Sequence, residues 1–196
     1  MNTDWEKRYI TGETPWEKGA PHPALVAFVK SAPVRGRVFV PGCGTGHDVR
    51  ALAATADEVL GLDIAPSAIA AAKSQPQIGG ERFMLGDLFA LPAEMRGYFD
   101  WVVEHTCFCA IPPSLRPNYV RAVASVLKAG GHLLAVFYLT PDMEPGESGP
   151  PFGATVAELD KLFTPYFTME KEWSPPATHA GREGRELCRL LVRCSA

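Results

Sequence analysis

The fold of this chain is decided at residues 36–46, which read GRVFVPGCGTG. The apolar run at 36–40 predicts a buried strand, and it leads through Gly42 and Gly44 into a helix predicted over 47–56. Glycine lets the backbone turn tightly and approach a ligand closely, and a helix start offers free N–H groups. The spacing GxGxG differs from the GxGxxG of dinucleotide-binding loops. It therefore favours a sugar ring and an amino-acid tail over a pyrophosphate.

Two aspartates follow the next two predicted strands. Asp63 ends the strand at 58–63, where a carboxylate can accept both hydroxyls of a ribose. Asp87 follows the strand at 82–86, where it can accept from an adenine amino group. The carboxyl ends of parallel strands meet at one edge of a sheet, so both side chains are expected in one crevice. The alternative interpretation is a plain glycine turn with both aspartates as helix N-caps.

The rest of the chain alternates strand-like and helix-like segments. Strands are predicted at 36–40, 58–63, 82–86, 99–104, 132–138, 167–173 and 187–194, with helices at 23–30, 47–56, 66–73, 118–127 and 156–163. This order predicts an α/β fold with a doubly wound, mostly parallel seven-stranded sheet. The last two strands have no helix between them and are expected to form an antiparallel edge. No linker or repeat divides the chain, so residues 1–196 are predicted to form a single domain.

The composition excludes several classes of protein. Nineteen basic and 22 acidic residues give a net charge of −3 without a Lys/Arg run, which argues against a nucleic-acid partner. No apolar run is long enough for a membrane span, and the N-terminus is too polar for a signal peptide. We therefore expect a cytoplasmic protein. The five cysteines are scattered, and Cys107 and Cys109 lack a second ligand pair, so we expect reduced thiols and no metal site.

Residues 1–20 form an arm with three aromatic side chains, Trp5, Tyr9 and Trp16, among charged residues. Composition leaves two interpretations open. The aromatic rings either anchor the arm to the body of the protein or form a lid over a ligand.

Longer stretches of the sequence resemble a known family. The glycine loop followed by the two aspartates resembles class I S-adenosylmethionine-dependent methyltransferases. The segments WEKRY at 5–9, TPW at 14–16, VPGCG at 40–44 and EHTCFCAIP at 104–112, with Arg116 and Tyr119, look like the thiopurine S-methyltransferase family. GPPF at 149–152 and ATHAGREG at 177–184 look most like its halide/thiol (thiocyanate) methyltransferase branch. The resemblance runs from about residue 5 to residue 190.

The resemblance implies a Rossmann-like class I methyltransferase fold and S-adenosylmethionine as the cofactor, with S-adenosylhomocysteine as the product. It also implies that the arm covers the cofactor. The cofactor-binding residues that it implies are Trp5, Trp16, Gly42, Gly44, Asp63, Asp87, Leu88 and His105. Among these, Asp63 would hold the ribose, and Asp87 with Leu88 would hold the adenine. His105 stands where the thiopurine enzymes place an arginine.

Methyl transfer from a sulfonium is an in-line displacement, and a soft nucleophile needs no general base. We therefore assign no catalytic acid or base, and expect an aromatic substrate pocket of Trp16, Phe108, Tyr138 and Phe152. The predicted substrate is a halide, thiocyanate, hydrosulfide or thiol. The protein is predicted to be a monomer or a weak dimer. The alternatives are a thiopurine or aromatic-thiol S-methyltransferase and a non-catalytic S-adenosylmethionine-binding module. A nicotinamide-dependent oxidoreductase would need GxGxxG and a catalytic Tyr/Lys or His pair, which are not found.

Overall fold

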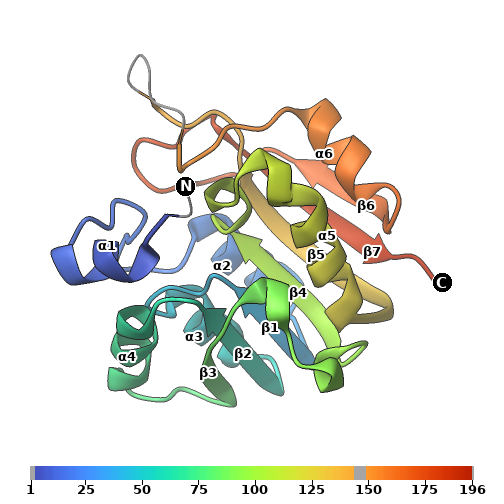
Figure 1. The fold of residues 1–196 in the computed structure, drawn as a ribbon. Coiled ribbons are helices and arrows are strands. Elements are labelled where there is room, and N and C mark those ends of the chain that lie inside the picture. Colours follow the sequence, from blue (N-terminus) through green and yellow to red (C-terminus); the bar gives the residue numbers. More distant parts are fainter. Residues whose placement is uncertain (1–2, 144–148, 196) are drawn as a thin grey trace.

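The computed structural model describes residues 3–143 and 149–195 and shows a seven-stranded sheet flanked by helices (Figure 1). The strand order is β3-β2-β1-β4-β5-β7-β6. The strands are β1 (Arg37–Pro41), β2 (Glu58–Asp63), β3 (Glu81–Leu85), β4 (Phe99–His105), β5 (Leu127–Tyr138), β6 (Phe167–Trp173) and β7 (Glu186–Arg193). Strands β1 to β5 are parallel, and β7 is antiparallel to both β5 and β6. The predicted fold class and antiparallel edge are confirmed.

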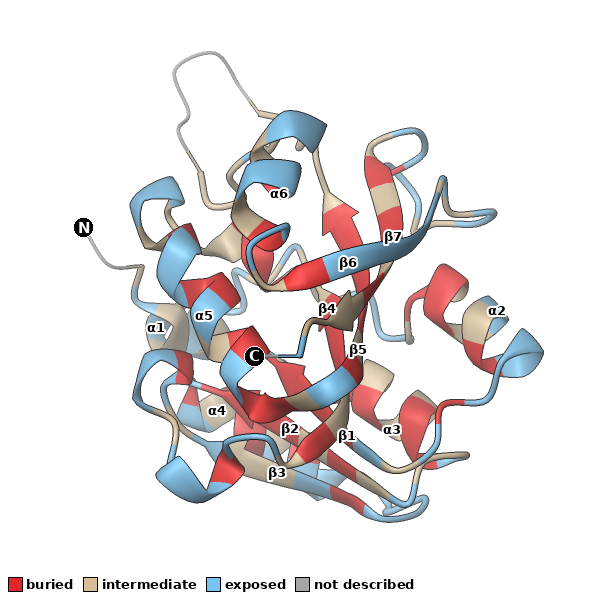
Figure 2. Ribbon diagram, turned by 90° about the vertical axis from the view of Figure 1, so that its right-hand side faces the viewer, coloured by how far each residue is buried: buried red, intermediate tan, exposed pale blue. Residues whose placement is uncertain are grey.

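Helices cover both faces of the sheet (Figure 2). They are α1 (Trp5–Thr11), α2 (Pro23–Ser31), α3 (His47–Ala53), α4 (Pro66–Ser74), α5 (Arg116–Val126) and α6 (Val156–Phe163). Figure 2 shows α2 and α3 on one side of the sheet and α5 and α6 on the other. The short 3-10 turns η1 (Leu88–Ala90) and η3 (Phe108–Ala110) follow β3 and β4. Among the described residues, no helix is long and apolar enough to cross a membrane.

The core lies in two layers because side chains alternate along each strand. On β5, Leu133 and Phe137 pack into the cluster that contains α5 and α6, whereas Leu134 packs with α2 and α3. The same alternation places Phe39 of β1 in the first cluster and Val40 in the second. The central strands are thus buried on both faces, as parallel sheets require.

The direction in which strands are added to the sheet reverses at β1, and this positions the site. From β1 the chain continues outward to β2 and β3, and then returns to place β4 on the other side of β1. A crevice forms outside the carboxyl ends of the strands at such a switch point. The loops that follow β1, β2, β3 and β4 therefore meet at the same edge of the sheet.

Two boundaries differ from the sequence predictions by three residues or more, and one helix was not predicted. The helix predicted over 47–56 ends at Ala53, and β5 begins at Leu127 rather than at residue 132. The arm also contains α1, which the sequence pattern did not predict. Asp4 caps its first turn by accepting the Lys7 N–H, and Gly12 ends it in a left-handed conformation. These local caps define a helix too short for a periodic hydrophobic pattern.

Phe163 anchors α6 on the sheet, so we expect Phe163→Ala to lower the free energy of unfolding by about 3–5 kcal/mol. Its ring is 2% exposed and lies between 5.3 and 5.9 Å from those of Phe137, Phe108 and Phe167. The measurement is urea denaturation followed by circular dichroism. The control is Val156→Ala on the same helix, where 42% of the residue is exposed and the effect should stay within about 0.5 kcal/mol. Equal midpoints for the two variants would contradict the prediction.

Candidate functional site

A cavity of about 550 Å³ opens at the carboxyl ends of the strands. The loops after β1, β2, β3 and β4 contribute Gly42, Asp63, Asp87 and Thr106 to its wall. The arm covers it with Trp5, Tyr9 and Trp16, among other residues. The sheet therefore brings together side chains that the sequence places on four separate strand ends.

The glycine loop packs so closely that its conformation needs glycine. Gly42 has a φ of 60°, and a Cβ atom there would lie 2.8 Å from the Cys107 Sγ atom. Gly44 has a φ of 53°, and its N–H donates to the Asp63 carboxylate at 2.8 Å. The loop that ends β1 is thus tied to the end of β2.

Asp63 is held in one orientation by backbone donors. Its Oδ2 atom accepts from Gly44 and its Oδ1 atom accepts from the Ala65 N–H at 2.9 Å. Burial raises the pKa of this carboxyl group, although the backbone donors oppose the shift. The residue is 8% exposed and lines the cavity, so its remaining lone pairs are available to a hydroxyl-bearing ligand.

Asp87 and Leu88 lie at the next strand end. Asp87 accepts the Phe89 N–H at 2.8 Å and so caps η1, and it also lines the cavity. Two apolar wall residues next to Asp63 and Leu88 were not predicted from the sequence. Ile64 and Phe89 are 52% and 42% exposed, and both line the cavity. Their positions in the sequence were a signal, since Ile64 directly follows Asp63 and Phe89 directly follows Asp87 and Leu88.

The arm closes on the cavity through its aromatic side chains. The rings of Trp5 and Trp16 meet edge to face at 5.4 Å, and Trp16 donates its indole N–H to the Tyr9 hydroxyl at 3.1 Å. The Arg8 guanidinium lies 4.5 Å from the Trp16 ring. All four side chains line the cavity. This placement favours the lid over the simple anchor.

Two carboxylates bind the arm to the body. Glu6 accepts the N–H and the hydroxyl of Ser67, at the start of α4, at 2.9 and 2.6 Å. Glu17 accepts the Thr45 hydroxyl in the glycine loop and lies 3.1 Å from the His47 imidazole. We call Glu6 and Glu17 the arm latches.

The four expected substrate-pocket residues divide into two groups. Trp16 and Tyr138 line the cavity, but Phe108 and Phe152 are not part of its wall. The Phe108 N–H donates to Glu104, and the Phe108 ring packs in the core against Tyr119 and Phe137 instead. Cys109, Ala110, Pro150 and Pro151 form the wall in their place.

His105 and Gly44 line a smaller hollow of about 60 Å³, which shares Trp16, Gly42 and Thr106 with the main cavity. Arg182 is a wall residue of the main cavity that was not predicted from the sequence. Its guanidinium lies 4.6 Å from the Tyr138 ring, donates to Glu186 at 3.2 Å and lies 3.5 Å from His105 Nε2. It comes from the loop between β6 and β7, so its sequence neighbours do not reveal its location.

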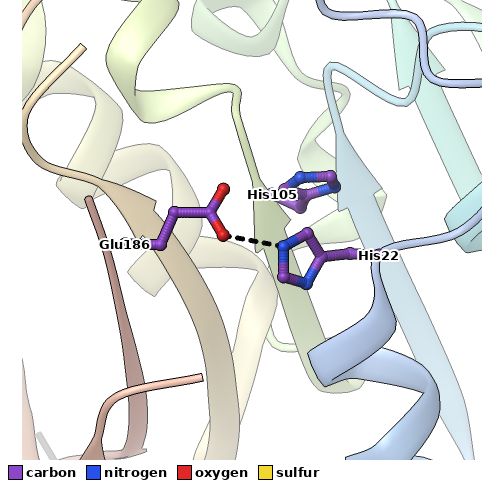
Figure 3. A group of neighbouring side chains, drawn as sticks. All are labelled: His22, His105 and Glu186. Atoms are coloured by element: carbon purple, nitrogen blue, oxygen red, sulfur yellow. Dashed lines mark hydrogen bonds and ion pairs between the residues drawn. The ribbon is translucent and has the colours of Figure 1, made fainter. Parts of the chain in front are cut away.

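His22, His105 and Glu186 lie close enough to suggest a metal site (Figure 3). The hydrogen bonds argue against it. His22 Nδ1 accepts the Ala24 N–H at 3.2 Å, so the proton of a neutral ring is on Nε2, which faces Glu186 at 2.9 Å. That nitrogen has no lone pair for a metal ion, and the Arg182 guanidinium would repel one.

The thiol of Cys109 is a separate case. Burial raises the pKa of this thiol to about 12 and disfavours the thiolate that a metal requires.

Glu104 lies beneath the cavity wall and is 1% exposed. It accepts the Phe108 N–H at 2.9 Å and the Tyr119 hydroxyl, and so holds η3 against α5. Burial raises the pKa of this carboxyl group to about 7. The wall formed by Cys109 and Ala110 therefore rests on a carboxyl group that changes charge near neutral pH.

A model of the thiopurine S-methyltransferase family matches residues 1–180. The chain is 35% identical over 167 residues to probable thiol methyltransferase 2 of Arabidopsis thaliana, covering 82% of this chain and 71% of that protein. It is 35% identical over 189 residues to thiocyanate methyltransferase 1 of Brassica oleracea, covering 93% and 81%. These relatives confirm the resemblance found in the sequence.

Among solved structures, 1,6-didemethyltoxoflavin-N1-methyltransferase of Burkholderia thailandensis, with bound 1,6-didemethyltoxoflavin and S-adenosylhomocysteine, matches with a TM-score of 0.74. The match covers 98% of this chain and 86% of that chain at 17% identity. At that identity the likeness shows the fold alone.

The raised pKa of Glu104 predicts how stability depends on pH. The folded protein holds this proton more tightly than the unfolded chain, so its contribution to stability is lost as the pH rises from about 4.5 to about 7. Between pH 5 and pH 8, the free energy of unfolding of the unmodified protein should therefore fall by about 2–3 kcal/mol more than that of Glu104→Gln. The measurement is urea denaturation at both pH values. Glu94→Gln, at an exposed position, is the control, and parallel pH curves for both variants would refute the prediction.

Proposed function

The chain belongs to the thiopurine S-methyltransferase family, and from that membership we propose that it methylates a small soft nucleophile. It is an S-adenosylmethionine-dependent methyltransferase, and its second product is S-adenosylhomocysteine. The proposed nucleophiles are a halide, thiocyanate, hydrosulfide or a small thiol. Two relatives carry the names thiol and thiocyanate methyltransferase, which supports this class.

One observation carries the choice of substrate. The cavity that contains Asp63 and Asp87 also contains the Arg182 guanidinium beside the Tyr138 ring. A cation beside an aromatic face suits a polarisable anion, because the anion gains an ion pair while it loses water. Arg182 is 7% exposed, so little solvent screens its charge.

The chain's residues supply binding, orientation and exclusion of water. When bound, S-adenosylmethionine provides a methyl group on a positively charged sulfur. We assign Asp63 to the ribose, Asp87 and Leu88 to the adenine, and Trp5 and Trp16 to the cover over the cofactor. Gly42 lets the cofactor approach the backbone. Arg182 draws the anion in for an in-line displacement, which for iodide or thiocyanate requires no proton transfer.

The thiols in the wall do not compete for the methyl group. Cys107 and Cys109 line the cavity, and burial raises the pKa of both. The nearby charge of Glu104 raises both pKa values further. The two thiols therefore stay protonated at neutral pH, and a protonated thiol is a poor nucleophile.

Two alternatives remain for the same site. A thiopurine or aromatic thiol is favoured by the family description, and turnover of such a substrate above iodide would support it. A non-catalytic module would bind the cofactor without turning over any small nucleophile. We further propose a cytoplasmic monomer or weak dimer whose partner is a small molecule or an inorganic anion. The net charge of −3 supports the absence of a nucleic-acid partner.

Asp63→Ala should weaken S-adenosylmethionine binding, because the ribose hydroxyls lose a charged acceptor. Such hydrogen bonds are worth about 1.5–3 kcal/mol, which corresponds to roughly 10- to 150-fold in affinity. Calorimetric titration measures the change. Asp57→Ala, at the opposite end of β2 and exposed, is the control. Unchanged affinity in Asp63→Ala would remove this residue from the site.

The latches predict that the arm contributes to cofactor binding. The double variant Glu6→Gln, Glu17→Gln should bind S-adenosylmethionine about 5- to 20-fold more weakly, because two charge-assisted contacts to the body become neutral. The thermal melt of the cofactor-free protein should change little. Glu13→Gln removes the same charge from an exposed position in the arm and should bind as tightly as the unmodified protein. Equal affinity of all three proteins would show that the arm does not close by these contacts.

The proposed function itself is tested by the release of S-adenosylhomocysteine with different nucleophiles. Turnover should rank iodide above bromide above chloride, since the cost of removing water falls in that direction. Iodide turnover should be nearly flat with pH because no proton moves. A bell-shaped iodide profile would require an essential acid or base. A thiopurine with a higher kcat/KM than iodide and small thiols would move the enzyme to the thiopurine alternative.

A further inference from the structure

We propose that His105, oriented by Asp48, takes the proton from thiol and hydrosulfide substrates, so that the enzyme also accepts nucleophiles that arrive protonated. The inference rests on the proposed function and extends it. Anions such as iodide react without a base, whereas a thiol must first lose a proton. We assigned no base from the sequence because a soft nucleophile needs none, and the 57 positions between Asp48 and His105 give no sign of their pairing.

The two side chains form a carboxylate–imidazole pair. His105 ends β4 and Asp48 lies in the first turn of α3, and the Nδ1 and Oδ2 atoms are 2.6 Å apart. The side chains are 10% and 15% exposed. The Asp48 Oδ1 atom also accepts the backbone N–H of His22 at 2.8 Å. Burial alone would raise the pKa of Asp48, but His105 and this N–H lower it, so Asp48 is ionised and accepts the Nδ1 proton.

The second nitrogen of His105 is left as a proton acceptor. Its neighbour is Arg182 NH1 at 3.5 Å, and a guanidinium can only donate. With the proton on Nδ1, the lone pair of Nε2 therefore faces Arg182. That guanidinium is part of the wall of the cavity, so a nucleophile drawn to Arg182 arrives next to a base that is already in the required tautomer.

The other imidazoles nearby do not offer an equivalent base. His22, whose ring centre is 4.5 Å from that of His105, donates its Nε2–H to Glu186 and accepts from Ala24 through Nδ1 (Figure 3). His179 lies 6.0 Å from His105, and burial with the neighbouring positive groups lowers its pKa to about 4. A group with so low a pKa accepts a proton poorly at neutral pH.

Several charged groups surround His105. Asp48 and Glu186 carry two negative charges in the cluster, and Arg182 carries one positive charge. Glu104, which precedes His105 in β4, adds a further negative charge above pH 7. An imidazolium at His105 would balance the cluster of Asp48, Glu186 and Arg182 to neutrality.

The step is balanced in atoms and charge. The S–H bond of the thiol breaks, and its proton forms a bond to His105 Nε2. The sulfur electron pair then forms the new bond to the methyl carbon as the bond from that carbon to the sulfonium breaks. The products are a thioether and S-adenosylhomocysteine, and the imidazolium later releases its proton to water.

The test compares 2-mercaptoethanol, which is protonated at pH 7, with iodide, which carries no proton. S-adenosylhomocysteine release is measured at saturating cofactor for the unmodified protein, His105→Gln and Asp48→Asn. In His105→Gln, the ratio of thiol to iodide kcat at pH 7 should fall by about 10²-fold or more. The ratio should recover as the pH rises and the thiol ionises in solution. Asp48→Asn should lower the ratio in the same direction, and His132→Gln on β5 should leave it unchanged.

Weaker cofactor binding or lower stability in a variant lowers the turnover of both substrates equally. The ratio of thiol to iodide kcat is therefore unaffected by either change. A ratio that is unchanged in His105→Gln, or that falls without recovering at high pH, would overturn the proposal. So would an unmodified enzyme that turns over iodide but no thiol, which would leave the proposed function standing. Failure to turn over either nucleophile would reject the proposed function, and the inference with it.

Discussion

The rest of the site depends on the close contact between the glycine loop and the ends of the two neighbouring strands. Gly42 leaves no room for a Cβ atom against Cys107 after β4, and the Gly44 N–H binds Asp63 at the end of β2. These contacts bring the carboxyl ends of β1, β2 and β4 together at the point where the strand order reverses. The cavity exists because this approach is possible, and a side chain at residue 42 would push the β4 loop away.

The cavity combines two different electrostatic regions. Asp63 and Asp87 offer acceptors for hydroxyl and amino groups, whereas Arg182 offers a buried cation. Burial keeps the thiols of Cys107 and Cys109 protonated, so that these wall residues remain unreactive. Together with His22, Asp48, His105 and Glu186, Arg182 forms a cluster that holds two carboxylates and one guanidinium almost out of solvent. Such a cluster is stable only because each charge has a partner within hydrogen-bonding distance.

The arm lies against the cavity and is held to the body of the fold by few contacts. It packs few apolar side chains into the core, and polar contacts at the latches, Glu6 and Glu17, hold it to α4 and to the glycine loop. Segments held by exposed and half-exposed contacts open at lower free energy than core strands. Opening of the arm would therefore uncover the cavity while the sheet stays folded.

The sequence by itself determined the α/β fold class with its mostly parallel sheet, the glycine loop, and the places of Asp63 and Asp87 at successive strand ends. Periodicity and turn chemistry are local properties, so they can be read along the chain. It also determined the family, since the matching motifs run along nearly the whole chain. Only the tertiary structure decided that Phe108 packs in the core, that Arg182 enters the cavity, and that Asp48 meets His105. These outcomes depend on how distant segments pack, on how Asp48 orients the His105 side chain, and on which loop covers the strand ends. No spacing along the chain encodes them.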